Sequence, residues 1–193
     1  MICGLILAAG AGTRFGERSK LLAELDGRPL LEHAIAAQCA VAGLGRVAVV
    51  LGAFAEDILA RVEFMRSEPV VCERWHEGQA LSLRRGIEYL TESPDVKKVI
   101  VTLGDQPRMT AEVIARFVGE PPGTRAMYGG RPGHPVVLGP VQMRAIARLR
   151  GDHGAREILQ GGLTIECGRL SAGRDVDTPE DLEAIRHEAR AVV

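Results

Sequence analysis

The first feature with the makings of a chemical site is a glycine-rich segment near the amino end of the chain. An apolar run ends at residue 8, and Gly10, Gly12 and Gly16 follow it, with Arg14 between them and Lys20 four residues further on. Glycine lets consecutive backbone N–H groups turn toward one anion, and the two basic side chains add the charge that amides lack. The segment therefore predicts a phosphate-binding loop.

The spacing of the glycines separates this loop from two well-known phosphate loops. A GxGxxG dinucleotide fingerprint would have its third glycine at position 15, where Phe15 stands. A P-loop would have Gly-Lys followed by Ser or Thr, which is absent from this segment. Taken alone, the segment is also compatible with a glycine turn whose basic side chains are simply hydrated.

A carboxylate that could hold a metal follows the apolar run 99–103, in the sequence Gly104-Asp105-Gln106-Pro107. Mg²⁺ in proteins prefers one or two carboxylates together with substrate phosphates. Asp105 is therefore the first candidate metal ligand, with Gly104 clearing space beside it. The alternative is an Asp that initiates a turn before Pro107.

A second acidic segment lies near the carboxyl end, where Asp175 and Asp177 precede Thr178, Pro179 and Asp181. The last three residues predict the start of a helix, with Thr178 as its N-cap. That interpretation leaves the first two carboxylates unexplained. Alternate residues of an extended segment point the same way, so the two could share a metal, or one could lie behind the other. Asp177 is the second candidate ligand, and the role of Asp175 stays open.

These residues must be positioned by an alternation of short apolar runs and longer segments of helical period. Three runs, at 5–7, 47–51 and 99–103, are continuously apolar, as strands buried on both faces are. The alternation predicts a doubly wound α/β fold, a mainly parallel sheet flanked by helices, in a single domain over residues 1–193. Ligands bind such sheets at the carboxyl ends of the strands. The predicted strands are 2–8, 46–51, 70–72 and 99–103, the predicted helices are 29–42, 56–62, 79–90, 141–150 and 155–160, and loops are predicted at 120–123 and 129–133.

The composition argues against several classes of partner. Lys and Arg number 24 against 25 Asp and Glu, a formal net charge of −1, so no positive field is available to hold nucleic acid. No stretch approaches the roughly 18 apolar residues that a membrane span needs. The four cysteines are scattered without CxxC spacing, which indicates reduced thiols in a cytoplasmic protein.

The segment from Leu7 to Gly16, followed by Lys20-Leu21-Leu22, resembles the signature of nucleotidyltransferases of the MobA-like NTP-transferase family. Within that family the chain is most similar to molybdenum cofactor (molybdopterin) cytidylyltransferases. The resemblance implies a Rossmann-like fold of the nucleotide-diphospho-sugar transferase type and a Mg²⁺-dependent enzyme. Such an enzyme transfers CMP from CTP to a phosphorylated pterin-type acceptor and releases pyrophosphate, and a molybdoenzyme would be its client. The loop begins Ala8-Ala9-Gly10 where guanylyl-transferring relatives usually have Ala-Gly-Gly, which favours CTP.

The resemblance also implies roles for individual residues. Arg14, Lys20 and Asp105 would be the catalytic residues, and Asp105 and Asp177 would bind the metal. The segments Gly133-His134-Pro135 and Gly151–Arg156 would face the acceptor through His134, Asp152 and Arg156. The nucleotide would contact Ala8, Ala9, Gly10, Ala11, Gly12, Thr13, Arg14, Lys20, Gly78 and Ser82.

Three alternatives stay open at this point. The first is a sugar-phosphate nucleotidyltransferase of the same fold, or one that uses another small phosphorylated acceptor. The second is a non-catalytic carrier of a finished cofactor, which would have little use for a triphosphate and metal site. The third is a dinucleotide-binding oxidoreductase, which Phe15 and the lack of an acidic residue directly after the run 47–51 disfavour.

Overall fold

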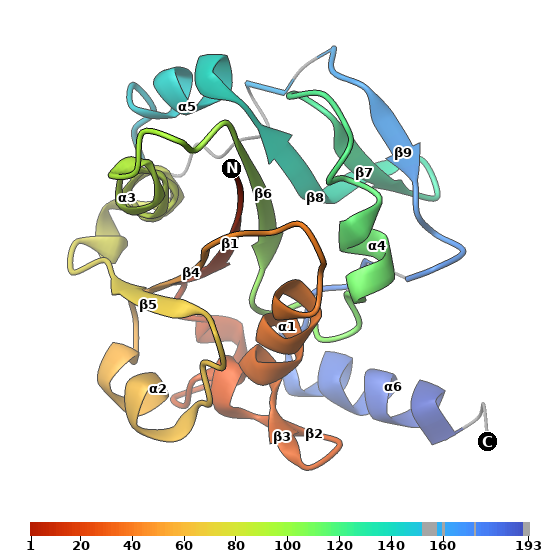
Figure 1. Cartoon of the computed structure of the whole chain (residues 1–193). Coiled ribbons are helices and arrows are strands. Elements are labelled where there is room, and N and C mark those ends of the chain that lie inside the picture. The colour runs from red at the N-terminus through yellow and green to blue at the C-terminus, as the bar shows by residue number, and fades with distance from the viewer. Residues whose placement is uncertain (152–157, 160, 172, 191–193) are drawn as a thin grey trace.

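The computed structural model describes residues 1–151, 158–159, 161–171 and 173–190. Over these residues the chain forms a seven-stranded sheet and a separate two-stranded hairpin, with helices packed on both faces of the sheet (Figure 1). The strand order is β5-β4-β1-β6-β8-β7-β9. The predicted α/β fold with a mainly parallel, helix-flanked sheet is therefore confirmed.

The strands of the large sheet are β1 (Ile2–Ala8), β4 (Val47–Leu51), β5 (Glu68–Val71), β6 (Lys98–Leu103), β7 (Arg125–Tyr128), β8 (Arg131–Leu138) and β9 (Thr164–Glu166). The hairpin consists of β2 (Glu24–Leu25) and β3 (Arg28–Pro29). The helices are α1 (Leu30–Cys39), α2 (Ala55–Arg61), α3 (Gln79–Thr91), α4 (Ala111–Ala115), α5 (Pro140–Ile146) and α6 (Pro179–Arg190). Strands β5, β4, β1 and β6 pair in parallel, whereas β8 runs antiparallel to β6.

The two faces of the central strands pack against different helices because successive side chains of a strand point to opposite faces. On β1, Cys3 and Leu5 belong to the same buried cluster as Leu83 of α3. Ile6 and Ala8 pack instead with the buried side of α1. Figure 1 shows the same division, with α3 and α5 on one side of the sheet and α1 and α4 on the other.

The register of the parallel strands brings three chain segments out of the sheet side by side. Leu7 of β1 lies opposite Leu103 of β6, and Ala8 lies opposite Leu51 of β4. The backbone N–H of Gly104 donates to the carbonyl of Leu7 at 2.9 Å, which continues the ladder past the end of β6. The glycine-rich segment after β1 and the acidic segment after β6 therefore leave the same edge next to each other.

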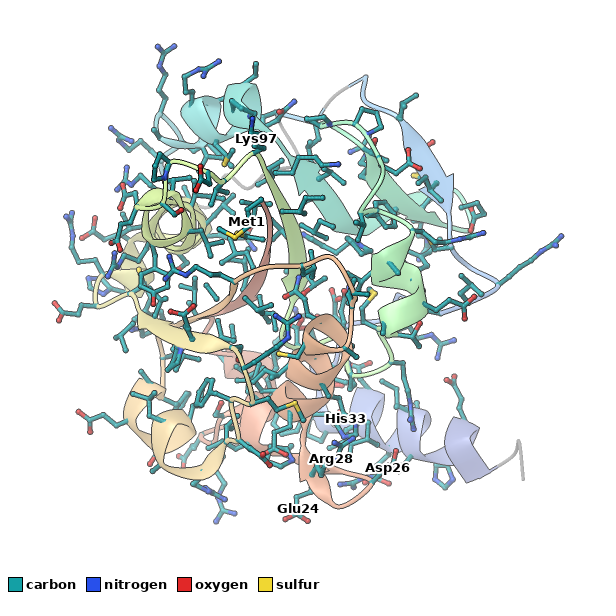
Figure 2. All side chains as sticks on the ribbon, in the orientation of Figure 1. Met1, Glu24, Asp26, Arg28, His33 and Lys97 are labelled. Carbon is teal, nitrogen blue, oxygen red and sulfur yellow. The ribbon has the colours of Figure 1, made fainter. Side chains whose placement is uncertain are left out.

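Two further contacts fix the start of β1 and β6 and the position of the hairpin (Figure 2). Met1 and Lys97 lie together where β1 and β6 begin, and the N–H of Lys97 donates to the Met1 carbonyl at 2.9 Å. The hairpin of residues 24–29 is tied to α1 because His33 Nε2 is hydrogen-bonded to the Leu25 carbonyl at 2.8 Å. That hairpin was not predicted, since strands of two residues show no period.

The predicted ends of the elements agree with the structure in some places and differ in others. The strand 2–8 was predicted with its observed bounds, whereas the helix predicted over 141–150 ends at Ile146. Residues 131–133, predicted as loop, begin β8, because the turn at Gly129-Gly130 is confined to two residues at positive φ. The helix predicted over 155–160 falls largely outside the described residues. The cysteines are free thiols, as predicted, and no helix among the described residues is long and apolar enough to span a membrane.

The close packing of α3 on the sheet generates a stability prediction at Gly86. A Cβ at this position would lie 2.5 Å from Leu5 Cδ1 and 2.7 Å from Val50 Cγ2, in a fully buried layer. We expect Gly86→Val to lower the free energy of unfolding by about 2 kcal/mol or more, measured by urea denaturation, because an overpacked core must shift to relieve the clash. Gly119→Val is the matched control, since a Cβ there meets nothing within 4 Å. Equal urea midpoints for Gly86→Val and Gly119→Val would contradict this packing.

Candidate active site

The glycine-rich segment is shaped by Gly12. This residue has a left-handed backbone (φ 59°) and begins a short 3₁₀ turn over Thr13–Phe15. A Cβ on Gly12 would lie 3.2 Å from the aliphatic stem of Lys20. A side chain at this position would therefore be strained in the backbone and would also crowd Lys20.

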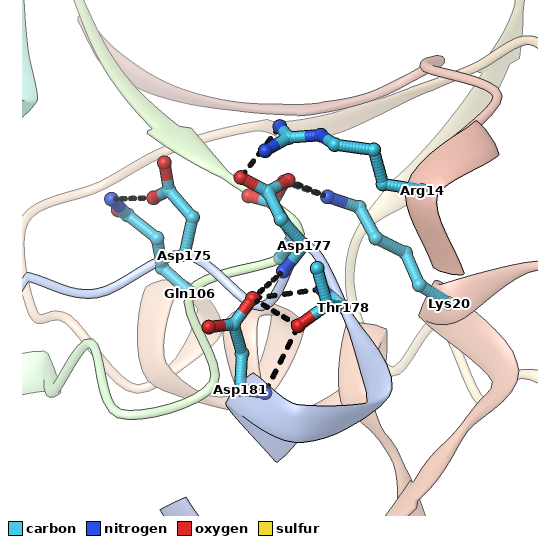
Figure 3. Close-up of polar contacts among 8 residues, drawn as sticks. Arg14, Lys20, Gln106, Asp175, Asp177, Thr178 and Asp181 are labelled. Carbon is cyan, nitrogen blue, oxygen red and sulfur yellow. Dashed lines mark hydrogen bonds and ion pairs between the residues drawn. The ribbon is translucent and has the colours of Figure 1, made fainter. Parts of the chain in front are cut away.

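The ammonium group of Lys20 joins three distant parts of the chain (Figure 3). Its Nζ donates to Asp105 Oδ2 at 2.6 Å. It also donates to Asp177 Oδ1 at 2.8 Å, as Figure 3 shows. Arg14 reaches the other oxygen of Asp177, with its Nη2 2.8 Å from Oδ2. The glycine-rich segment, the end of β6 and the residue before the α6 cap therefore meet in one cluster of two cations and two carboxylates.

The charge on Lys20 is maintained by its partners. Its side chain is only 10% exposed, and burial opposes the charged form, but Asp105 and Asp177 outweigh that effect and raise the pKa of Lys20. A buried charge is tolerated where it is paired and hydrogen-bonded. Lys20 is therefore an ammonium ion at neutral pH, and together with Arg14 it balances the charge of the two carboxylates.

Two hollows meet at Asp105. One, of about 250 Å³, is lined by charged groups that include Arg14, Lys20, Asp105 and Asp177. The other, of about 350 Å³, is lined by Asp105 together with Trp75 and other residues from the start of α3. Each residue predicted from the sequence to contact the nucleotide lines one of the two hollows: Ala8, Ala9, Gly10, Ala11, Gly12, Thr13, Arg14, Lys20, Gly78 and Ser82.

The second hollow also contains side chains from segment 75–83, which the family resemblance places facing the nucleotide base without giving these side chains individual roles. Trp75, His76 and Gln79 line it beside Ser82. Trp75 is the single tryptophan of the chain, and a Cβ on Gly52 would lie 2.5 Å from the Trp75 Cβ. A lone tryptophan in the loop before a helix was the available signal, but the contact that fixes its position is visible only in the fold.

Gly78 lies against the backbone of Gly151, a contact that the sequence did not predict. The family resemblance implies that Gly78 contacts the nucleotide. In the structure Gly78 has a φ of 114°, and a Cβ on it would lie 2.3 Å from the carbonyl oxygen of Gly151. That same carbonyl accepts from the N–H of Ala80 at 3.1 Å. The glycine is therefore required by packing within the protein.

The start of α6 combines a helix cap with a site residue. The Thr178 hydroxyl accepts from the Asp181 N–H at 3.2 Å, and Asp181 Oδ2 accepts from the N–H of Thr178 at 2.8 Å and of Asp177 at 3.0 Å. These bonds are the predicted cap. They use the backbone of Asp177 and leave its carboxylate to face Lys20, so the cap does not exclude a role for that carboxylate in the site.

Asp175 has a different partner from Asp177. Its Oδ1 accepts from Gln106 Nε2 at 2.7 Å, as Figure 3 shows. Burial raises the pKa of Asp175, and the neighbouring charge of Asp105 adds to the effect. Of the two arrangements that the sequence left open, the structure places the Asp175 carboxylate on Gln106, while Asp177 faces the two cations.

The residues present fit a divalent cation that is held jointly with a substrate. Among the described residues, no group of three or more His, Cys, Asp or Glu side chains could hold a metal ion by itself. Asp105 and Asp177 are both paired with Lys20, and Asp105 Oδ1 is buried without a hydrogen-bond partner in the described part of the chain. Two carboxylates with a free oxygen suit Mg²⁺, which takes its other ligands from phosphates and water.

The expected acceptor residues are only partly described. Asp152 and Arg156 lie outside the described residues. His134 lies on β8, whose antiparallel pairing brings its first residues to the carboxyl end of β6. Burial lowers the pKa of His134 to about 4, so its ring is neutral at pH 7. It can offer an acceptor phosphate a hydrogen bond but no positive charge.

Comparison with known proteins adds independent findings. Residues 4–169 match the family model of the MobA-like NTP transferase domain. The chain is 34% identical to nicotine blue oxidoreductase from Paenarthrobacter nicotinovorans, with 94% of each chain covered. The crystal structure of a homologue of Mycobacterium tuberculosis Rv0371c, from Mycobacterium sp. strain JC1, superposes with a TM-score of 0.85 at 26% identity, over 100% of this chain and 98% of that one. Rv0371c from M. tuberculosis in complex with manganese gives a TM-score of 0.75 at 25% identity, over 97% and 98%.

The neutral ring of His134 generates a prediction about pH. As the pH falls from about 6.5 to about 4, an unfolded chain with the ordinary imidazole pKa takes up a proton that the folded protein does not, so stability is lost across this window. We expect this residue to contribute about 2 kcal/mol of that loss, reduced from the full shift because the ring is only partly buried. His134→Gln should flatten the pH dependence of the unfolding free energy.

His187→Gln serves as the control for this measurement, because that ring is exposed on α6. Urea unfolding at several pH values would compare both variants with wild type. An unchanged slope in His134→Gln would show that the ring is hydrated in the folded protein.

Proposed function

Since the chain belongs to the MobA-like NTP transferase family, we propose that it transfers CMP from CTP to a phosphorylated molybdopterin-type acceptor and releases pyrophosphate. The observation that supports nucleotidyl transfer is the position of the Lys20 ammonium between Asp105 and Asp177, at the mouth of the glycine-rich segment. A polyphosphate with a bound cation needs both positive side chains and carboxylates in one place. The charged hollow offers both.

The two hollows divide the nucleotide between them in this proposal. The triphosphate lies in the charged hollow, where the segment of residues 8–13 wraps it and Arg14 and Lys20 neutralise phosphate charge. The base lies in the second hollow, beside Trp75 and Ser82. The α-phosphate then falls near Asp105, where the hollows meet. The preference for CTP rests on the loop sequence Ala8-Ala9-Gly10.

The reaction needs little proton transfer from the protein. An oxygen of the acceptor phosphate attacks the α-phosphorus of CTP in line, a new P–O bond forms, and the bond to the β-phosphate oxygen breaks, so that pyrophosphate leaves. A phosphate monoester is already ionised near pH 7, so no side chain must act as a general base. The residues of the chain contribute by positioning and by stabilising charge, through Arg14 and Lys20.

The cation would be held by Asp105 and Asp177, and we propose Mg²⁺. When bound, it supplies further neutralisation of phosphate charge. On the acceptor side the proposal assigns His134, Asp152 and Arg156, with His134 as a neutral hydrogen-bonding group. A cytoplasmic location and a molybdoenzyme client complete the proposal.

A second candidate function follows from one comparison. A relative that covers 94% of this chain is named an oxidoreductase, so hydride transfer between a nicotinamide dinucleotide and a small molecule is the alternative reaction. The second hollow would then hold the nicotinamide nucleotide. Phe15 at the place of the third fingerprint glycine disfavours this candidate.

The proposed role of Asp105 gives the first activity prediction. Asp105→Ala should lower the rate of pyrophosphate release from CTP, acceptor and Mg²⁺ by at least ~100-fold, comparable with the loss of one preorganised electrostatic group. Asp57→Ala is the control, because Asp57 is exposed in the first turn of α2. A near-normal rate in the Asp105 variant would remove Asp105 from the proposed machinery.

Ligand-induced thermal shifts separate the two candidate functions. With Mg²⁺ present, CTP at 100 times its dissociation constant should stabilise the protein by ~2.7 kcal/mol, with smaller shifts for GTP, ATP and UTP at equal concentration. Lys20→Met should lose most of the CTP shift, because the phosphates lose a buried cation. Stabilisation by NADH or NADPH with no response to any nucleoside triphosphate would favour the oxidoreductase instead.

A further inference from the structure

The segment that carries Asp177 is fastened to the end of β6 by Gln106. The Gln106 side chain is 3% exposed. Its Nε2 donates to Asp175 Oδ1 at 2.7 Å and to the carbonyl of Gly173 at 3.3 Å. The N–H of Val176 donates to the Asp105 carbonyl at 2.9 Å. Residues 105–106 thus bind three successive points of the acidic segment.

The beginning of the same segment, at Gly173, packs against Tyr128. Gly173 has a φ of 59°, and a Cβ on it would lie 2.6 Å from Tyr128 Cδ2. The Tyr128 hydroxyl is fixed in turn, because it donates to the His134 carbonyl at 2.7 Å. Gly173 therefore packs against the Tyr128 ring and also accepts a hydrogen bond from Gln106.

Asp177 is consequently fixed from both directions along the chain. Downstream, Asp181 accepts a hydrogen bond from its backbone N–H at 3.0 Å. Upstream, the nearest side-chain attachment is the bond between Asp175 and Gln106. The backbone on either side of Asp177 is therefore held by these two attachments, together with the bond from the Val176 N–H to the Asp105 carbonyl.

The side chain of Gln106 is itself informative. Its Oε1 is buried without a hydrogen-bond partner among the described residues. Its amide group, by contrast, donates to two acceptors at once. The geometry of the residue is that of a donor aimed at the acidic segment.

We propose that Gln106 is a positioning residue, which holds Asp177 against Lys20 and the nucleotide-bound cation through its hydrogen bond to Asp175. In this assignment Asp175 is a hydrogen-bond acceptor and not a ligand of the cation. The statement about the cation rests on the function proposed above. The placement of Asp177 against Lys20 is independent of that function.

The hydrogen bond can be broken and rebuilt by exchanging its two partners. Gln106→Glu sets two carboxylates against each other and removes the donor. Asp175→Asn keeps an oxygen that can accept from Gln106. The double variant Gln106→Glu, Asp175→Asn restores a bond in the reverse direction and has the same net charge as wild type. Asp177→Asn provides the reference for losing a metal ligand.

The first readout needs neither metal nor nucleotide. The rate at which Lys20 is acylated by acetic anhydride, followed by mass spectrometry, reports how firmly Asp177 holds the ammonium group. Gln106→Leu, which removes the donor without adding a charge, should raise this rate at least about 3-fold, as expected for one lost hydrogen bond, while the double variant, which has the net charge of wild type, stays near wild type. An unchanged rate in Gln106→Leu, or a double variant as reactive as Gln106→Leu, would overturn the positioning role.

The second readout is the affinity for Mn²⁺ in the presence of CTP, measured by electron paramagnetic resonance of the free ion. Gln106→Glu should weaken it about 10-fold, equal to about 1.4 kcal/mol, and the double variant should recover most of that loss. If Asp175→Asn weakens Mn²⁺ binding as much as Asp177→Asn does, Asp175 is a ligand and the assignment is wrong. If wild type binds no Mn²⁺ with any nucleotide, the proposed function fails, and the acylation rates still decide the positioning role.

Discussion

The site depends on one constraint, which is that the nearly buried ammonium of Lys20 must be compensated by carboxylates from elsewhere in the chain. Asp105 and Asp177 meet this need, although they lie 85 and 157 residues away in sequence. An uncompensated charge at this depth would be costly, and the same holds for either carboxylate left alone. The ion cluster therefore ties the amino-terminal loop, the end of β6 and the start of α6 to one geometry.

The sheet brings these chain segments close together independently of the ion pairs between them. Parallel pairing of β1 with β4 and β6 brings their carboxyl ends together, and the strands are buried on both faces, so their register is strongly specified. The α6 cap and the bond between Gln106 and Asp175 then fix the acidic segment relative to that edge. The sheet determines where the segments of the site leave the strands, and the hydrogen bonds orient the acidic segment relative to them.

Membership of a nucleotidyltransferase family and likeness to a named oxidoreductase are compatible at the level of the fold, because a fold does not determine a reaction. The distinction lies in the site. Two carboxylates around a lysine suit a polyphosphate with its cation, whereas hydride transfer has no need of that pair. The charged hollow thus favours transfer of a nucleotidyl group, and the second hollow, with Trp75, is where selectivity for a base or another ring would arise.

The sequence by itself determined the features that are local. The bounds of β1, the carboxylate after β6 and the cap at Thr178 and Asp181 follow from periodicity and spacing within a few residues. The tertiary structure decided the rest: that Gly78 is required by Gly151, that Asp175 belongs to Gln106 across 69 residues, and that burial keeps His134 neutral. The physical reason is that these properties depend on which distant groups share a site and exclude water from it, and no local pattern of residue types encodes that choice.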